Sequence, residues 1–224
     1  MLVNADFSRR VIVTPEQYEW ITSPQRGVER MMLERIGAEQ ARATSVVRYA
    51  ADSHFPGHAH PGGEEILVLS GTFSENDVHY QAGWYLRNPP GSVHRPSSAE
   101  GALIFVKLRQ MQPGDTQRVR LDTRDPARWQ REDGREVCPL FSYGSERVFL
   151  RRLSAGEVLF DGPVEGIELF VLSGDIVLGE QPCRRGSWIR LPKGAYPGFI
   201  AGARGATCYF KTGHLADPAV EACA

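Results

Sequence analysis

Residues 67–71 read Leu-Val-Leu-Ser-Gly, and residues 170–174 read Phe-Val-Leu-Ser-Gly. A second pair of matching stretches follows them. Residues 83–94 read Gly-Trp-Tyr-Leu-Arg-Asn-Pro-Pro-Gly-Ser-Val-His, and residues 186–197 read Gly-Ser-Trp-Ile-Arg-Leu-Pro-Lys-Gly-Ala-Tyr-Pro. Both pairs are 103 positions apart, from 71 to 174 and from 83 to 186. Two blocks that keep one spacing without a gap indicate two tandem copies of one structural unit.

The secondary structure expected for both copies is β. Glycine and proline interrupt short apolar runs about every ten residues, which is typical of a sandwich or barrel. We therefore predict an all-β fold of two tandem domains, residues 1–115 and 116–224. The segment 112–130, rich in Asp, Arg, Pro and Gln, is the expected linker. Before the first copy, Arg10–Val13 favours a strand, and Val28–Ile36 allows either a strand or a short helix.

Composition excludes several classes of function. There are 26 Lys and Arg residues against 27 Asp and Glu residues, so the formal net charge is −1. No basic surface of the kind that binds nucleic acids or anionic membranes is expected. The first ten residues contain no apolar core of signal-peptide length, and no stretch approaches a membrane span. The four cysteines form no Cys-x-x-Cys pair and are expected as reduced thiols, so we expect a cytoplasmic protein.

Four residues of the first copy have the chemistry of metal ligands. Residues 57–64 read Gly-His-Ala-His-Pro-Gly-Gly-Glu, and alternation along a strand places His58 and His60 on one side. A turn through the Pro-Gly-Gly sequence brings Glu64 beside them, and a second turn lets His94 enter the same interior. Unpaired, these side chains would cost several kcal/mol in lost solvation. A divalent cation would offset that cost, and three nitrogens with one oxygen suit zinc, iron, manganese, nickel or copper.

The second copy serves as an internal control for this assignment. At the 103-residue spacing, His58, His60, Glu64 and His94 are replaced by Asp161, Pro163, Ile167 and Pro197. The scaffold residues recur, whereas the four candidate ligands are lost together. Residues needed only for packing should not separate in this way. Glu65 persists as Glu168, so we interpret Glu65 as structural and Glu64 as the ligand.

These motifs resemble those of the cupin superfamily. The first cupin motif, His-x-His followed by Glu and Gly, is matched by His58, His60, Glu64 and Gly71. The second motif is matched by Gly83, Pro89, Gly91 and His94. Two positions depart from the family pattern, Asp52 for its leading Gly and Ser98 for its trailing Asn, and neither is a ligand. The resemblance implies two jelly-roll β-barrels, with the metal site in residues 1–115 and a degenerate domain over 116–224.

Within the superfamily, the run from Gly27 to Lys107 is similar to the cupin domain of ChrR-type anti-sigma factors. In those proteins a separate zinc-binding anti-sigma domain with a His-x3-Cys-x2-Cys pattern precedes the cupin. This sequence has no His before His54 and no Cys before Cys138, so sigma-factor binding is not expected to transfer. The resemblance does imply a divalent metal and a connection with oxidative stress or small-molecule sensing.

Three functions remain open on these observations. The first is a metal-binding sensor or regulatory module of an oxidative-stress or transcriptional response. The second is a non-haem metal dioxygenase that cleaves diketone or hydroxyaryl ketone substrates, as some similar cupins do. The third is a structural protein with a vestigial metal. In each case His58, His60, Glu64 and His94 hold the ion, and no catalytic residue is assigned. The expected partners are a small molecule at the metal and a second copy in a homodimer.

Overall fold

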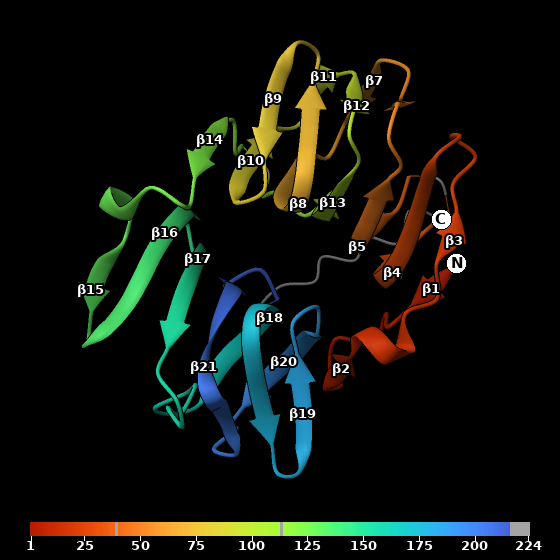
Figure 1. Cartoon of the computed structure of the whole chain (residues 1–224). Coiled ribbons are helices and arrows are strands. Elements are labelled where there is room, and N and C mark those ends of the chain that lie inside the picture. The colour runs from red at the N-terminus through yellow and green to blue at the C-terminus, as the bar shows by residue number, and fades with distance from the viewer. Residues whose placement is uncertain (39, 113, 216–224) are drawn as a thin grey trace. The chain divides into compact units, whose positions relative to one another are not determined.

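The computed structural model describes residues 1–38, 40–112 and 114–215, and it is almost entirely β (Figure 1). The chain divides into two compact units. Unit 1 consists of Met1–Ala5 and Tyr18–Pro126, and unit 2 consists of Asp6–Gln17 and the residues from Ala127 onward. The predicted all-β fold is thereby confirmed. None of the helices in the described ranges is long and apolar enough to cross a membrane.

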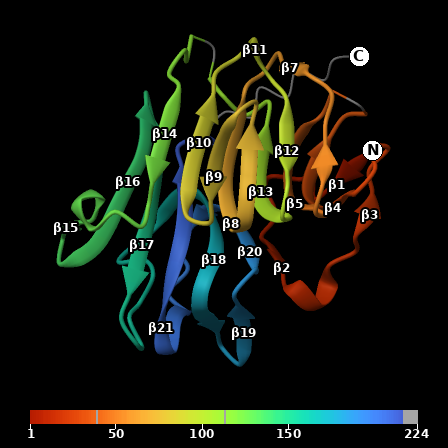
Figure 2. The same cartoon turned by 45° about the horizontal axis from the view of Figure 1, so that its top comes forward.

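Unit 1 is built on one antiparallel sheet. Its strands lie in the order β1 (Leu2–Val3), β4 (Val28–Ile36), β5 (Arg42–Tyr49), β13 (Ala102–Leu108), β8 (Glu64–Glu75), β10 (Trp84–Asn88) and β14 (Val119–Asp122). Shorter strands pair beside this path: β3 (Ile21–Thr22), β6 (Ser53–His54), β9 (Val78–Gln81) and β12 (Pro96–Ser98). Two further strands, β7 (His58–His60) and β11 (Ser92–His94), form a separate pair (Figure 2). Val28–Ile36 is thus a strand, not a helix.

Unit 2 repeats this strand order. Its sheet runs β15 (Gln130–Glu132), β16 (Arg135–Tyr143), β17 (Glu146–Leu153), β21 (Phe199–Thr212), β18 (Val164–Leu178), β20 (Trp188–Gly194) and β2 (Val11–Val13), with β19 (Gln181–Arg184) paired to β18. The described residues also form two short 3-10 helices, η1 (Pro15–Gln17) and η2 (Pro126–Arg128). Strand by strand, β8, β9 and β10 correspond to β18, β19 and β20, which agrees with the repeat found in the sequence.

The edge strands show how each unit is completed. β14 pairs with β10 in unit 1, and β2 pairs with β20 in unit 2. The expected linker over residues 112–130 therefore contains a strand of the first sheet. The predicted domain boundary lies at residue 115. In the structure, unit 1 extends to Pro126, and residues 6–17 belong to unit 2.

The glycine that ends each Leu-Ser-Gly stretch is required by the backbone. Gly71 and Gly174 both have positive φ, +69° and +67°, a region that L-residues with a side chain rarely adopt. A Cβ on either residue would lie 2.0 Å from a carbonyl oxygen, that of Gly101 or Gly205. The neighbouring strand pairs shift register close by, as at a β-bulge. The repeated motif is therefore a repeated bulge.

Each unit has its own apolar core. In unit 1, alternate residues of β8 such as Ile66 and Val68 pack inward with Phe73 and Leu86. The core of unit 2 includes three phenylalanines and two cysteines: Phe160, Phe199, Phe210, Cys183 and Cys208. Cys138, Cys183 and Cys208 are buried, whereas Cys223 lies outside the described residues.

Candidate metal centre

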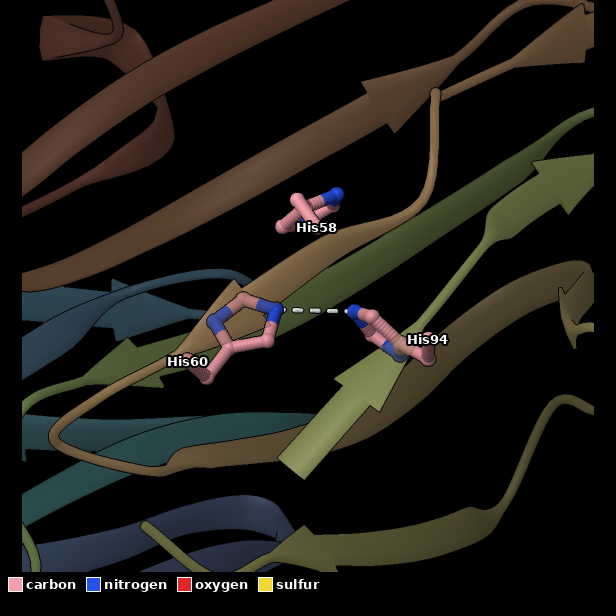
Figure 3. Close-up of side chains that lie close together, drawn as sticks. All are labelled: His58, His60 and His94. Carbon is pink, nitrogen blue, oxygen red and sulfur yellow. Dashed lines mark hydrogen bonds between the residues drawn. The ribbon is translucent and has the colours of Figure 1, made fainter. Parts of the chain in front are cut away.

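The three histidines are placed by the small β7–β11 ribbon. In its register His58 lies opposite His94, and His60 lies two residues further along β7 on the same face. The turn after His60 is fixed by Gly63, whose φ is +74° and whose Cβ would lie 2.3 Å from the Met111 sulfur. That turn leads directly into β8, which begins at Glu64. Figure 3 shows the three imidazoles facing one another.

The side chains converge to metal-binding distances. The ring centroids of His58, His60 and His94 lie 4.7–5.1 Å apart, and His60 Nε2 lies 2.8 Å from His94 Nε2. Glu64 Oε2 lies 3.7 Å from His60 Nε2 and 3.5 Å from His94 Nε2. Ligand atoms of an ion held at about 2.0–2.2 Å are themselves about 3–3.6 Å apart, so small side-chain shifts would accommodate one ion. The donor set fits a divalent transition metal.

A layer of hydrogen bonds orients these ligands. The carbonyl of Pro56 is 2.9 Å from His58 Nδ1, and Glu75 Oε1 is 2.9 Å from His94 Nδ1. Both contacts leave the Nε2 atoms of the two rings for the centre of the cluster. Asn88 Nδ2 donates to Glu64 Oε2 at 3.2 Å and also to Glu75. Such outer contacts fix the tautomer and the direction of metal ligands.

Arg120 holds the outer layer in place from β14. Its guanidinium donates to the carboxylate of Glu75, to Asn88 Oδ1 at 2.6 Å and to the hydroxyl of Tyr80 at 3.0 Å. Glu75 also lies within ligand distance of Glu64 and His94. Because Arg120 and His94 Nδ1 already occupy both of its oxygens, we assign Glu75 to the supporting layer.

The electrostatics of the cluster favour a bound cation. Burial, with the His94 and His58 rings close by, lowers the pKa of His60 to about 3, so its imidazole is neutral and available as a ligand. Burial raises the pKa of Glu64 to about 7. For His94 and Glu75, burial acts against the net pKa shift. The hydrogen bond between the two side chains raises the pKa of His94 and, together with the charge of Arg120, lowers the pKa of Glu75. A buried carboxyl beside the neutral ring of His60 is an arrangement that a cation would stabilise.

A cavity of about 690 Å³ opens beside the histidines. His58 and His60 line it, together with an apolar wall that includes Phe55, Ala41 and Leu108. This volume lies within the range usual for small-molecule sites. Two of the three histidines are therefore accessible to a molecule in the cavity.

Residues 8–112 match the model of the ChrR cupin-like domain family. The chain contains a ChrR cupin-like domain. The match includes all four candidate ligands and the bulge at Gly71, and it ends before β14. The resemblance expected from the sequence is confirmed. A comparison with curated protein sequences gives no match.

Solved structures of similar fold come from several bacteria. A protein named as a putative dioxygenase from Nostoc punctiforme is 14% identical, with a TM-score of 0.77 over 95% of this chain and 85% of its own. The Escherichia coli pirin YhhW in complex with nickel(II) is 12% identical, with a TM-score of 0.65 and coverages of 91% and 99%. A cupin 2 conserved barrel domain protein from Leptotrichia buccalis is 11% identical, with a TM-score of 0.59 and coverages of 95% and 99%. At these identities the likeness shows the fold.

The ChrR cupin-like domain brings the four predicted residues together, and unit 2 has no equivalent cluster among its described residues. Asp161 there pairs with Arg135 at 2.8 Å, and Ile167 is buried in the core. Glu65 points away from the cluster and pairs with Arg87 at 2.9 Å.

Three supporting residues were not predicted from the sequence: Glu75, Asn88 and Arg120. At the 103-residue spacing Glu75 and Asn88 become Leu178 and Leu191, so the comparison that singled out the ligands also carried this signal. Arg120 lies outside the repeat, and no sequence signal placed it at the site.

Proposed function

We propose that His58, His60, Glu64 and His94 hold one divalent transition metal, and that a small molecule approaches the ion through the cavity beside them. The observation that carries this proposal is that His58 and His60 belong both to the cluster and to the cavity wall. A bound ion would supply Lewis-acid character and open coordination positions. The chain contributes oriented imidazoles, a buried carboxylate and a largely apolar chamber. Together these features support a metal-dependent enzyme of the non-haem dioxygenase type.

Metal analysis of the purified protein tests the site. The wild-type chain should retain about one ion after desalting, whereas His58→Ala/His60→Ala should retain less than a tenth of that amount. Val93→Ala is the matched control, because Val93 lies next to His94 on β11 but is 64% exposed. Equal metal in the wild type and the double variant would contradict the assignment. Oxygen consumption by the iron-loaded protein with 1,3-diketones and hydroxyaryl ketones then tests the enzyme.

A sensor or regulatory role is the second candidate, and the match to the ChrR cupin-like family favours it. In this role the metal and its ligand change the stability or surface of the domain without turnover. Tightly held zinc, with no oxygen consumed on any ketone of the panel, would support the sensor and contradict the dioxygenase. No sigma-factor partner is proposed.

The supporting layer yields a separate prediction. Asn88→Leu copies the residue of the second repeat and removes the hydrogen bonds to Glu64 and Glu75. We expect the affinity for zinc to fall about 10–100-fold, because ligands without outer contacts lose their orientation. Competition with a chromogenic chelator measures this affinity. An affinity within twofold of the wild type would show that Asn88 does not position the ligands.

A further inference from the structure

Among the residues that the structure describes, the wall of the cavity beside the histidines contains three arginines and no carboxylate. Arg30, Arg35 and Arg109 lie in its wall, and none of the other residues that line it is Asp or Glu. Arg30 forms no ion pair with any residue that the structure describes. Arg35 donates to the carbonyl of Ala38, and Arg109 donates to the carbonyl and side chain of Gln40. Each guanidinium is therefore available to an anion.

A β-bulge places two of these arginines on the same side of β4. Arg30 pairs with Val47 and Arg35 with Ala43, and the register shifts between Met32 and Glu34. Residues 43 and 47 of the regular neighbouring strand face the same way, so Arg30 and Arg35 do as well. Val47 belongs to the core of unit 1, which makes this the inner face. Without the bulge, Arg35 would point to the opposite face.

The two guanidiniums repel each other in this position. Arg35 is partly buried, and burial together with the charge of Arg30 lowers its pKa from the ordinary value. Two like charges on an inner face are costly unless an anion lies between them. The guanidinium fork matches a carboxylate in particular, because it can donate two parallel hydrogen bonds.

We propose that this cavity binds a small organic carboxylate, with its acid group against Arg30 and Arg35 and its apolar part against Phe55 and Leu108. The inference deepens the proposed function, on which it rests for the contact between this molecule and the metal. The apolar wall excludes a bare inorganic anion as the best occupant. A substrate or effector of this chain is thus an acid.

Ligand-observed NMR titration of the full chain tests the proposal. The probes are benzoate and hexanoate, their neutral amides, and phenylphosphonate, each with the zinc-loaded and the metal-free protein. We expect at least one acid to bind about tenfold or more tightly than its amide. Arg30→Gln and Arg35→Gln should each weaken acid binding about 10–100-fold and leave amide binding within twofold. The amide then reports that each variant is folded.

The control is Arg48→Gln. Arg48 lies on the adjacent strand β5 but pairs with Glu29 at 2.7 Å, on the face opposite to Arg30, so acid binding should not change. The inference would be overturned if no acid bound more tightly than its amide, or if neither Arg30→Gln nor Arg35→Gln weakened acid binding. Phenylphosphonate binding tenfold tighter than benzoate would overturn the carboxylate assignment. Arginine-dependent binding to a protein that takes up no metal would refute the proposed function alone.

Discussion

Replacing Arg87 with alanine should lower the free energy of unfolding of unit 1 by about 3–5 kcal/mol. Arg87 is fully buried and donates to Glu65 Oε2 at 2.9 Å and to Asp115 Oδ2 at 2.7 Å. Both carboxylates are also buried. Alanine would remove the guanidinium that contacts both buried carboxylates, and the lost solvation of those charges determines the size of the effect.

The two units require a measurement that reports on each of them. Trp20 and Trp84 lie in unit 1, and Trp129 and Trp188 lie in unit 2, so fluorine NMR of 5-fluorotryptophan protein during urea titration distinguishes the units. The control is Arg48→Ala, which removes an exposed pair with Glu29 and should cost about 0–1 kcal/mol. Arg87→Met/Glu65→Met/Asp115→Leu should be more stable than Arg87→Ala, since it removes the two carboxylates together with the guanidinium. A loss below 1 kcal/mol in Arg87→Ala would contradict the argument.

The same arginine shows what the sequence could establish about the fold. Glu65 and Arg87 recur as Glu168 and Arg190, so the repeat marked them as structural, and the glycine of the bulge recurs for a backbone reason. The position of β2, which lies near the N-terminus but forms the edge of the sheet in unit 2, could not be predicted. β2 has three residues and pairs with β20, nearly the whole chain away, and no local pattern specifies a partner at that distance.

The candidate site likewise has residues that the sequence predicts and residues that it does not. The ligands were predictable because strand alternation and the loss of all four in the second repeat both point to them. The cavity arginines were not predictable, because arginine is the commonest cation throughout this sequence. Placing Arg30 and Arg35 on one face also requires the bulge in β4, and a single extra residue in a strand leaves no mark in an apolar run.

Phe199→Ala should destabilise unit 2 by about 3–5 kcal/mol, the cost of an unfilled core cavity. Phe199 is fully buried, and its ring centroid lies 5.9 Å from that of Phe160. At the 103-residue spacing these phenylalanines occupy the positions of Pro96 and Gly57, next to the candidate ligands of the first repeat. Where unit 1 gathers imidazoles, unit 2 therefore places aromatic rings, and its stability there comes from packing.

This contrast predicts different responses to metal. Zinc should raise the unfolding midpoint reported by Trp84, because an ion that binds only the folded state stabilises it by mass action. The midpoint reported by Trp188 should not move in either the wild type or Phe199→Ala, since Ile167 and Leu191 replace the ligand Glu64 and its partner Asn88. Val158→Ala, at a 40% exposed position of unit 2, should change stability by less than about 0.5 kcal/mol. If zinc shifted the unfolding midpoint reported by Trp188 as much as that reported by Trp84, the proposal that metal stabilises only unit 1 would be refuted.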